Sequence, residues 1–156
     1  MVYMDKYFNI FKSLSDEQIQ EGPIVKIDEL MAPTIRVLNI SGFYTVSCNS
    51  GHVHNWVDEN PIKADLMIYI AFKIPYNQAK EMGFTIPDGY KFESFEDVIE
   101  NKNNDDNFPT FRIIHDSSIF NHQENIFIQI MRENIKLYEW PMNMYTKKRL
   151  NKEKYI

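Results

Sequence analysis

The chain has 156 residues, of which 44% are hydrophobic and 14% aromatic, and a formal net charge of −5 at pH 7. This length predicts a single domain, and the composition supplies enough apolar surface for a core, which excludes global disorder. With 5 Gly in all, a glycine-rich phosphate loop has little to be built from, and the acidic balance disfavours a non-specific nucleic-acid binder.

The expected surroundings of the chain follow from its cysteine count and its hydropathy. Cys48 is the single cysteine, which excludes an internal disulfide framework and is typical of a reducing compartment. Residues 1–6 lack a basic region followed by a long apolar run, so no signal peptide is expected. No stretch approaches the ~18 consecutive apolar residues of a membrane span. We therefore predict a cytoplasmic protein with no membrane partner.

The first 22 residues show a helix-like spacing of apolar side chains. This spacing predicts two short helices, or one helix and an arm. Ser15-Asp-Glu-Gln18 matches a capping box that would begin the second helix, and Gly22-Pro23 should end it. The apolar stripe consists of Tyr7, Phe8, Ile10, Phe11 and Leu14.

The next helix is predicted within residues 28–40, where a start at Asp28 would place Pro33 in the helix interior. Pro33 is compatible with a helix that begins near Ala32, because proline is tolerated in the first turn. Gly42 supplies the C-terminal stop. Residues 43–48 then alternate as a half-buried strand with Cys48 on its inner side. Residues 49–51 are expected to break this strand, and residues 52–65 to form a polar loop.

The most apolar run of the chain spans residues 66–72. Its length and its content of β-branched and aromatic residues predict a central strand covered on both faces. A short helix over residues 76–82 should end at Gly83. Pro87-Asp-Gly89 predicts a turn, because proline presets φ and glycine permits positive φ.

The C-terminal third alternates between polar and apolar segments. A capped helix is expected over residues 94–100, a solvated acidic loop over 101–107 and a strand over 110–115. Residues 123–139 favour a helix by composition, although a hairpin that turns at Glu133-Asn134 fits the same apolar positions. Pro141 should end either structure.

Together these elements predict an α+β fold. We expect a small mixed β-sheet with the strand at about residues 66–72 in its centre and helices packed mainly on one side. Residues 1–145 should form one globular domain, and residues 146–156 a frayed basic C-terminal tail.

One short stretch gathers the residues with reactive side chains. Cys48, His52 and His54, with His115 brought from another strand, offer thiolate and imidazole ligands suited to zinc. Their Cys-x3-His-x-His spacing differs from that of the common structural zinc sites. Cys48 could also act as a nucleophile with a histidine base. Because it shares a strand face with Tyr44 and Val46, a buried and inert thiol is the competing interpretation.

The same stretch also suits ligand binding. Hydroxyl, amide, imidazole and backbone N–H groups are concentrated in this turn, and consecutive N–H groups can form a concave nest for an anion. An ordinary polar turn that satisfies its own backbone is the alternative. The ligand-binding residues predicted here are Ser47, Asn49, Ser50, Gly51, His52 and His54.

Residues 35–72 carry a resemblance to known proteins. The pattern Leu38-Asn39…Gly42-Phe-Tyr-Thr-x-Ser-Cys48…Gly51-His52, followed by Tyr69-Ile-Ala-Phe72, resembles small uncharacterised proteins of low-GC Gram-positive bacteria and their phages, which implies a fold and a pocket. It is more distantly similar to the wybutosine-synthesising tRNA methyltransferase 3 family, with Asn49 as an insertion and His52 in place of an arginine. That similarity implies an S-adenosylmethionine-dependent methyl transfer on tRNA.

The sequence thus favours a cytosolic binding domain for a small anionic or nucleotide-like ligand. Two alternatives stay open. One is a metal-dependent hydrolase or transferase that uses Cys48, His52 and His54. The other is an interaction protein, such as a phage-derived inhibitor, whose negative charge meets a basic partner.

Overall fold

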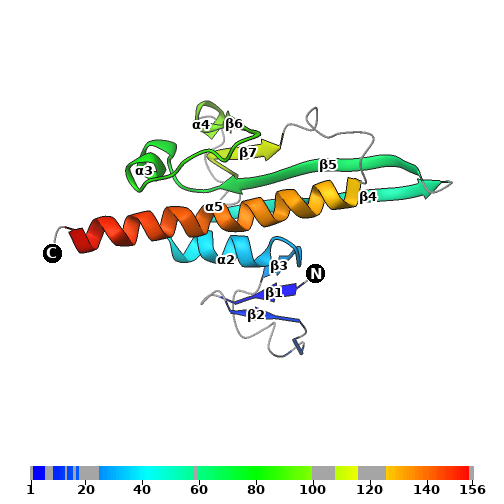
Figure 1. Ribbon diagram of the computed structural model, residues 1–156, viewed down its shortest axis with the longest axis horizontal. Helices are drawn as coiled ribbons and strands as arrows, with labels where there is room; N and C mark the ends of the chain where they lie inside the picture. The colour runs from blue at the N-terminus through cyan, green and yellow to red at the C-terminus, as the bar shows by residue number, and fades with distance from the viewer. Residues whose placement is uncertain are drawn as a thin grey trace.

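The computed structural model describes residues 2–5, 9–12, 14–15, 17, 25–57, 60–99, 108–115 and 126–154; within these ranges the side chains of 52–66, 98–99, 126–127 and 147–154 are not described. The described residues form two antiparallel sheets and several helices (Figure 1). This confirms the α+β prediction. Every strand pairing is antiparallel, so the expectation of a mixed sheet was wrong.

The N-terminal sheet replaces the helices predicted for the first residues. It has the order β2-β1-β3, with β1 at Val2–Met4, β2 at Ile10–Phe11 and β3 at Val25–Ile27. Val2 and Met4 are buried while Tyr3 is half-buried, which is the alternation of a strand. Cross-strand pairing with β3 therefore overrides the local helical spacing. The predicted second helix lies largely outside the described residues.

Helix α2 spans Ala32–Ile40 with Pro33 in its first turn, as predicted. Gly42 has a φ of 90° and completes a Schellman motif: its N–H donates to the Asn39 carbonyl at 3.0 Å, and the Phe43 N–H donates to the Leu38 carbonyl at 2.9 Å. The Asn39 amide nitrogen also donates to the Thr45 hydroxyl at 2.9 Å. This contact fixes the point at which the next strand begins.

The larger sheet has the order β4-β5-β7-β6, with β4 at Thr45–Val57, β5 at Asn60–Phe72, β6 at Tyr90–Ser94 and β7 at Phe111–His115. The central position of residues 66–72 and the strand at 110–115 are confirmed. The predicted break at 49–51 and loop at 52–65 are wrong, because β4 and β5 continue as one long hairpin. Gly51, with a φ of 87°, lies at a β-bulge in β4.

The short elements after β5 agree with the sequence. Helix α3 spans Tyr76–Glu81 and is followed by Gly83 with a φ of 94°. The Tyr90 N–H donates to the Pro87 carbonyl at 3.2 Å and closes the predicted turn. This turn leads into β6, which the sequence pattern did not reveal. Helix α4 spans Glu96–Ile99.

Helix α5 spans Ile126–Lys154. Of the two structures predicted for residues 123–139, the helix is therefore the one observed. Pro141 lies inside it, so the prediction that this proline ends the element was wrong, and the residues expected to form a frayed tail continue the helix as far as 154. Trp140 and Met144 on either side of Pro141 are buried. Pro141 is itself fully buried, so its ring packs in the core at the point where the helix lacks a backbone hydrogen bond. In Figure 1, α5 runs along β4 and β5 in nearly the same direction as these strands, with α2 beside it.

The core lies between the larger sheet and the two long helices. Ile68, Ile70 and Phe72 are fully buried on the inner face of β5, whereas Met67 on its outer face is 37% exposed. On the outer face Ala71 is buried, so the expected covering of both faces holds there and does not hold at Met67. An aromatic cluster closes the core beyond β5, where Phe72 stacks on Phe111 at a centroid distance of 4.8 Å.

We predict that Gly51→Ala destabilises the protein more than Gly83→Ala. Both changes place alanine at a positive φ, which costs about 1–2 kcal/mol. A Cβ at Gly51 would also lie 3.0 Å from Ile68 Cγ1, whereas one at Gly83 meets nothing within 4 Å. Crowding in the core should add about 1–3 kcal/mol. Urea unfolding of the two variants measures the difference; equal losses would contradict a tight bulge.

Candidate functional site

The strand alternation of β4 separates the predicted ligand-binding residues. Ser50 is fully buried beneath α5 and Gly51 is buried at the bulge, whereas Ser47 is exposed and Asn49 is half-buried on the opposite face. The backbones of His52 and His54 pair with Asp65 and Lys63, but their side chains lie outside the described residues. The six residues therefore do not form one turn, and those with described side chains lie on two faces of the sheet.

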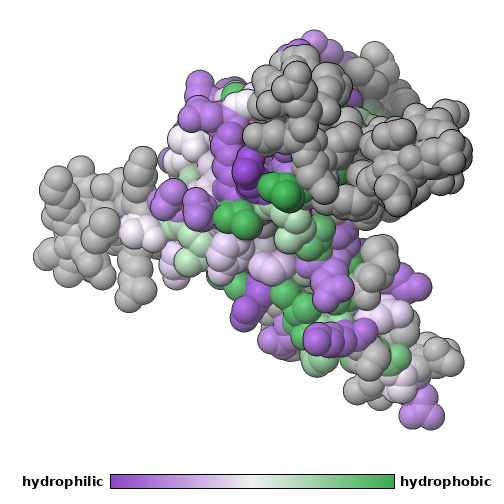
Figure 2. Space-filling view, turned by 45° about the vertical axis from the view of Figure 1, so that its right-hand side comes forward, coloured by the Kyte–Doolittle hydropathy of each residue, from purple (hydrophilic) through white to green (hydrophobic). Residues whose placement is uncertain are grey.

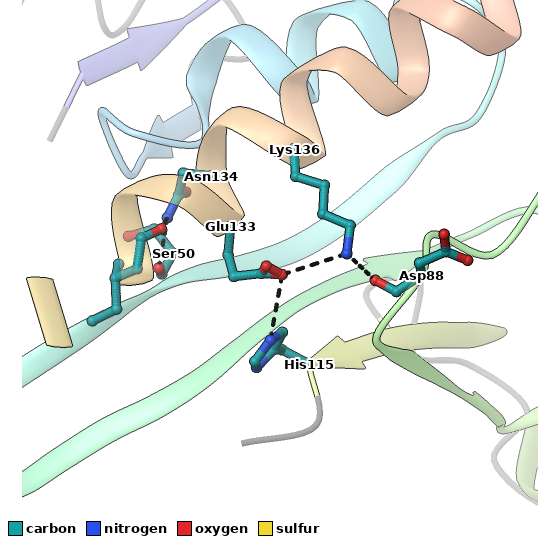
Figure 3. Close-up of polar contacts among 7 residues, drawn as sticks. Ser50, Asp88, His115, Glu133, Asn134 and Lys136 are labelled. Carbon is teal, nitrogen blue, oxygen red and sulfur yellow. Dashed lines mark hydrogen bonds and ion pairs between the residues drawn. The ribbon is translucent and has the colours of Figure 1, made fainter. Parts of the chain in front are cut away.

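Ser50 of β4 belongs to a polar cluster with Asn134 of α5, which Figure 3 shows, and with Asp28 in the segment before α2. The Ser50 hydroxyl donates a short hydrogen bond to the Asp28 carboxylate. The Asn134 amide nitrogen donates to the Ser50 carbonyl at 3.0 Å and to the Ile130 carbonyl at 2.8 Å. The first of these two Asn134 bonds ties α5 to β4 beside the bulge, and the second lies within α5.

Cys48 lies next to this cluster and faces the core. Burial, together with the nearby negative charge of Asp28, raises the pKa of the Cys48 thiol to about 12. The thiol is therefore protonated at neutral pH, and a protonated thiol is a poor nucleophile and metal ligand. This finding supports the interpretation of Cys48 as a small buried apolar side chain.

A second polar cluster also lies between α5 and the larger sheet, near β7 and the turn before β6. His115 Nε2 lies 3.4 Å from Glu133 Oε1, and Lys136 Nζ lies 3.7 Å from the same oxygen. Lys136 also donates a short hydrogen bond to the Asp88 carbonyl. The Tyr90 ring packs edge-on against His115 at 5.2 Å. Figure 3 shows Glu133 and Lys136 pointing from α5 toward β7 and the turn before β6.

The charges of this second cluster are set by its burial and its partners. Burial opposes ionisation of Glu133, but the hydrogen bond and charge of His115 and the charge of Lys136 outweigh it and lower the Glu133 pKa. Burial and the Glu133 charge raise the pKa of Tyr90. The His115 side chain is 0% exposed, so these groups act on one another and cross-link α5 to the sheet.

Glu133 and Asn134 were missed as site residues. The sequence places them at the tip of a possible hairpin, where polar residues are expected. They can be recognised as buried polar residues only once this segment is known to be a helix, because the helical period then places them on the same inward face as Ile130 and Leu137. A buried acid and amide among apolar neighbours require partners, and His115 and Ser50 provide them.

The outer face of the larger sheet presents a different set of side chains. Cross-strand partners share a face, and the register places Ser47, Ala71, Arg112 and Glu93 in one row. Asn49, Tyr69, Ile114 and Lys91 form the next row. This face therefore holds Ser47 and Asn49, two of the six residues predicted from the sequence to bind a ligand.

Arg112 is the central cation of the outer face. Its Nε donates to Glu93 Oε2 at 2.7 Å, and its side chain is 28% exposed. The guanidinium carbon lies 5.7 Å from the ring centroids of both Tyr69 and Phe95. Cation–π contacts with both rings limit the orientations that the guanidinium can take.

Comparison of the chain with protein-family models, curated proteins and solved structures finds no significant match. The resemblance based on residues 35–72 therefore stays a prediction. Among the residues that the structure describes, no group of three or more His, Cys, Asp and Glu side chains is arranged to hold a metal ion. No helix in the described ranges has the length and apolarity needed to cross a membrane.

The Asn134 contact predicts a stability loss. Asn134→Ala should lower the free energy of unfolding by about 1–3 kcal/mol, because the buried Ser50 carbonyl loses its donor. The matched control is Asn143→Ala on the exposed side of the same helix, which should change stability by less than about 0.5 kcal/mol. Urea unfolding followed by circular dichroism compares them, and similar values for both would contradict the role given to Asn134.

The Glu133 cluster predicts an acid-sensitive contribution to stability. Because folding lowers the Glu133 pKa below its ordinary 4.5, its ionisation stabilises the fold above that value, and this stabilisation is lost as pH falls through the lowered pKa. Glu133→Gln should therefore be less stable than wild type at neutral pH, and the difference should shrink in acid. Glu81→Gln on the exposed side of α3 is the control. A difference that is constant with pH would contradict the prediction.

Proposed function

We propose that this protein binds a small anionic, nucleotide-like ligand on the outer face of its larger sheet. The observation that supports this proposal is the register that gathers Ser47, Asn49, Tyr69 and Arg112 on one face. The location differs from the turn predicted from sequence, but the class of ligand is the same. As the sequence also suggests, we expect this binding to take place in the cytoplasm, because a single unpaired cysteine is typical of a reducing compartment.

The chemistry of the four side chains suits such a ligand. A guanidinium donates paired N–H groups to phosphate or carboxylate oxygens, and a hydroxyl and an amide add neutral donors. Tyr69 offers a half-exposed ring on which a planar base can stack. Stacking tolerates many bases, so selectivity among them should be modest.

The surrounding charges set the expected strength of binding. Glu93 already engages Arg112 at 2.7 Å, so a ligand anion shares the guanidinium with a carboxylate. Lys91, exposed on the same face, adds a positive charge in the neighbouring row. The net charge of −5 gives no long-range attraction for an anion. Binding should therefore depend on contacts at the sheet.

The metal-dependent enzyme gains less support from the described residues. Cys48, which that alternative needs as a thiolate, faces the core with a pKa of about 12. His115 lies against Glu133 under α5. These two members of the predicted metal set therefore make their contacts in the protein interior, away from the outer face.

Thermal-shift and calorimetric titrations with mononucleotides, cyclic nucleotides and inorganic phosphate test the proposal. At least one nucleotide should raise the melting temperature of the wild type. Ser47→Glu, which adds a negative charge to the outer face, should weaken binding on the order of tenfold or more. Gln78→Glu on the exposed side of α3 adds the same charge elsewhere and should leave binding unchanged.

The role of stacking is tested by Tyr69→Leu, which removes the ring on which a base would stack and keeps the Arg112 guanidinium. Affinity for the nucleotide should fall more than affinity for inorganic phosphate. If no member of the panel shifts the melting temperature, or if Ser47→Glu and Gln78→Glu behave alike, the proposed site is wrong.

A further inference from the structure

Helix α5 carries a continuous apolar line on the face turned away from the sheet. We call these six residues the α5 seam; each is between 39% and 56% exposed. In Figure 1, α5 lies in front of the larger sheet. Figure 2 shows hydrophobic residues at the surface near the centre of the picture. The α5 seam consists of Ile128, Met131, Ile135, Tyr138, Met142 and Tyr145.

The spacing of the α5 seam is that of a coiled coil. Successive members are alternately three and four residues apart, which reproduces the a and d positions of a heptad over 18 residues. A helix that only packs on its own sheet needs one apolar face. That face exists already on the opposite side of α5, where Ile130, Leu137 and Trp140 are buried. The seam is therefore a second apolar face that the fold itself does not use.

We propose that a second copy of this chain docks on the α5 seam, so that two α5 helices pack antiparallel about a two-fold axis. When Ile135 lies level with Tyr138 of the partner copy, the other seam residues also pair. Met131 then meets Met142 of the partner copy, and Ile128 meets Tyr145. In each layer an isoleucine faces a tyrosine or two methionines face each other, so the layers have similar volumes.

The charges beside the seam agree with this arrangement. Arg132 and Glu139, both exposed, each follow a d position and so lie on the same side of the seam. In the antiparallel pair, Arg132 lies about 3 Å along the axis from the level of Glu139 in the partner copy, a difference of two residues. The two-fold axis creates this opposite-charge contact twice, which favours the homodimer over an unrelated helix.

A parallel pair would lack these features. Each tyrosine of the seam would face the same tyrosine of the partner copy. Arg132 and Glu139 of the two copies would lie on opposite sides of the interface, because position e of one helix faces position g of the other in parallel coiled coils. The antiparallel orientation is therefore the one that the side chains of the α5 seam specify.

The size of the seam sets the expected strength of the dimer. The six side chains expose roughly 500 Å² on each copy, because a large side chain presents on the order of 200 Å² when fully exposed. Burying about 1,000 Å² in total is at the lower end of specific interfaces. The helix is already held by its contacts with β4 and with Thr85 in the loop after α3, so dimerisation does not require a free helix to become ordered. We expect a dimer that dissociates on dilution.

Sedimentation analysis of the full chain over a dilution series tests the dimer. The wild type should pass from dimer to monomer, and Ile135→Lys should raise the dissociation constant on the order of tenfold or more. The matched control is Ile40→Lys on α2, where the isoleucine is 52% exposed; it should leave association unchanged. Circular dichroism establishes that each variant folds. A wild type that is monomeric throughout, or a dimer unaffected by Ile135→Lys, overturns the proposal.

A charge swap tests the pairing of the two copies. Arg132→Glu and Glu139→Arg should each weaken the dimer, because each places like charges together, and the double variant should restore it. If the two copies associated through non-specific apolar contact, the double variant would not recover the dimer affinity of the wild type, and that result overturns the proposed geometry.

Cross-linking tests the orientation. Under mild oxidation, the double variant Ile128→Cys with Tyr145→Cys should form an interchain disulfide, because the antiparallel pair brings these positions together. Ile128→Cys alone should not, because the two copies of this position then lie about 25 Å apart along the axis. Cys48 is present in every variant and in the wild-type control. Efficient cross-linking of the single variant would indicate a parallel pair and overturn the antiparallel arrangement.

Discussion

The packing of α5 on the larger sheet is the interaction on which the rest of the structure depends. It places Asn134 against the carbonyl of Ser50 at 3.0 Å and Glu133 within 3.4 Å of His115. These polar contacts require a defined rotation and register of the helix, because each buried group would otherwise lack a partner. Apolar contacts alone, such as those of Ile130 and Leu137, would tolerate small shifts of the helix.

The same packing decides which residues of β4 are available for function. Once Ser50 lies under α5, the period of two in the strand also turns Cys48 inward, and it turns Ser47 and Asn49 outward. The inward residues serve stability, as the raised pKa of the Cys48 thiol reflects. Of the six residues predicted from the sequence, Ser47 and Asn49 are those whose described side chains face outward, and they share this face with Tyr69 and Arg112. The proposed site follows from strand alternation.

The sequence predicted the elements whose signals are local and missed those that depend on distant partners. Pro33 and Gly42 bound α2 through backbone geometry, and the apolar run of residues 66–72 identifies β5. By contrast, residues 49–51 resemble a turn, but Gly51 supplies the positive φ of a bulge and the strand continues by pairing with β5. Pairing across the chain likewise converts the helical pattern near the N-terminus into β1 and β2. The local pattern of apolar residues does not identify the strand that pairs with β4 or the strand that pairs with β1.

Helix α5 shows why a single apolar pattern can be ambiguous. Residues Ile130 and Leu137 face the sheet while Ile135 and Tyr138 face solvent, so apolar side chains occur on nearly all sides and mimic the alternation of a hairpin. Two separate apolar faces resolve this ambiguity, since each has its own helical period. The inward face contains an acid and an amide, whereas the α5 seam is apolar at all six of its positions. The more uniformly apolar of the two faces points to solvent, and the proposed dimer would cover it.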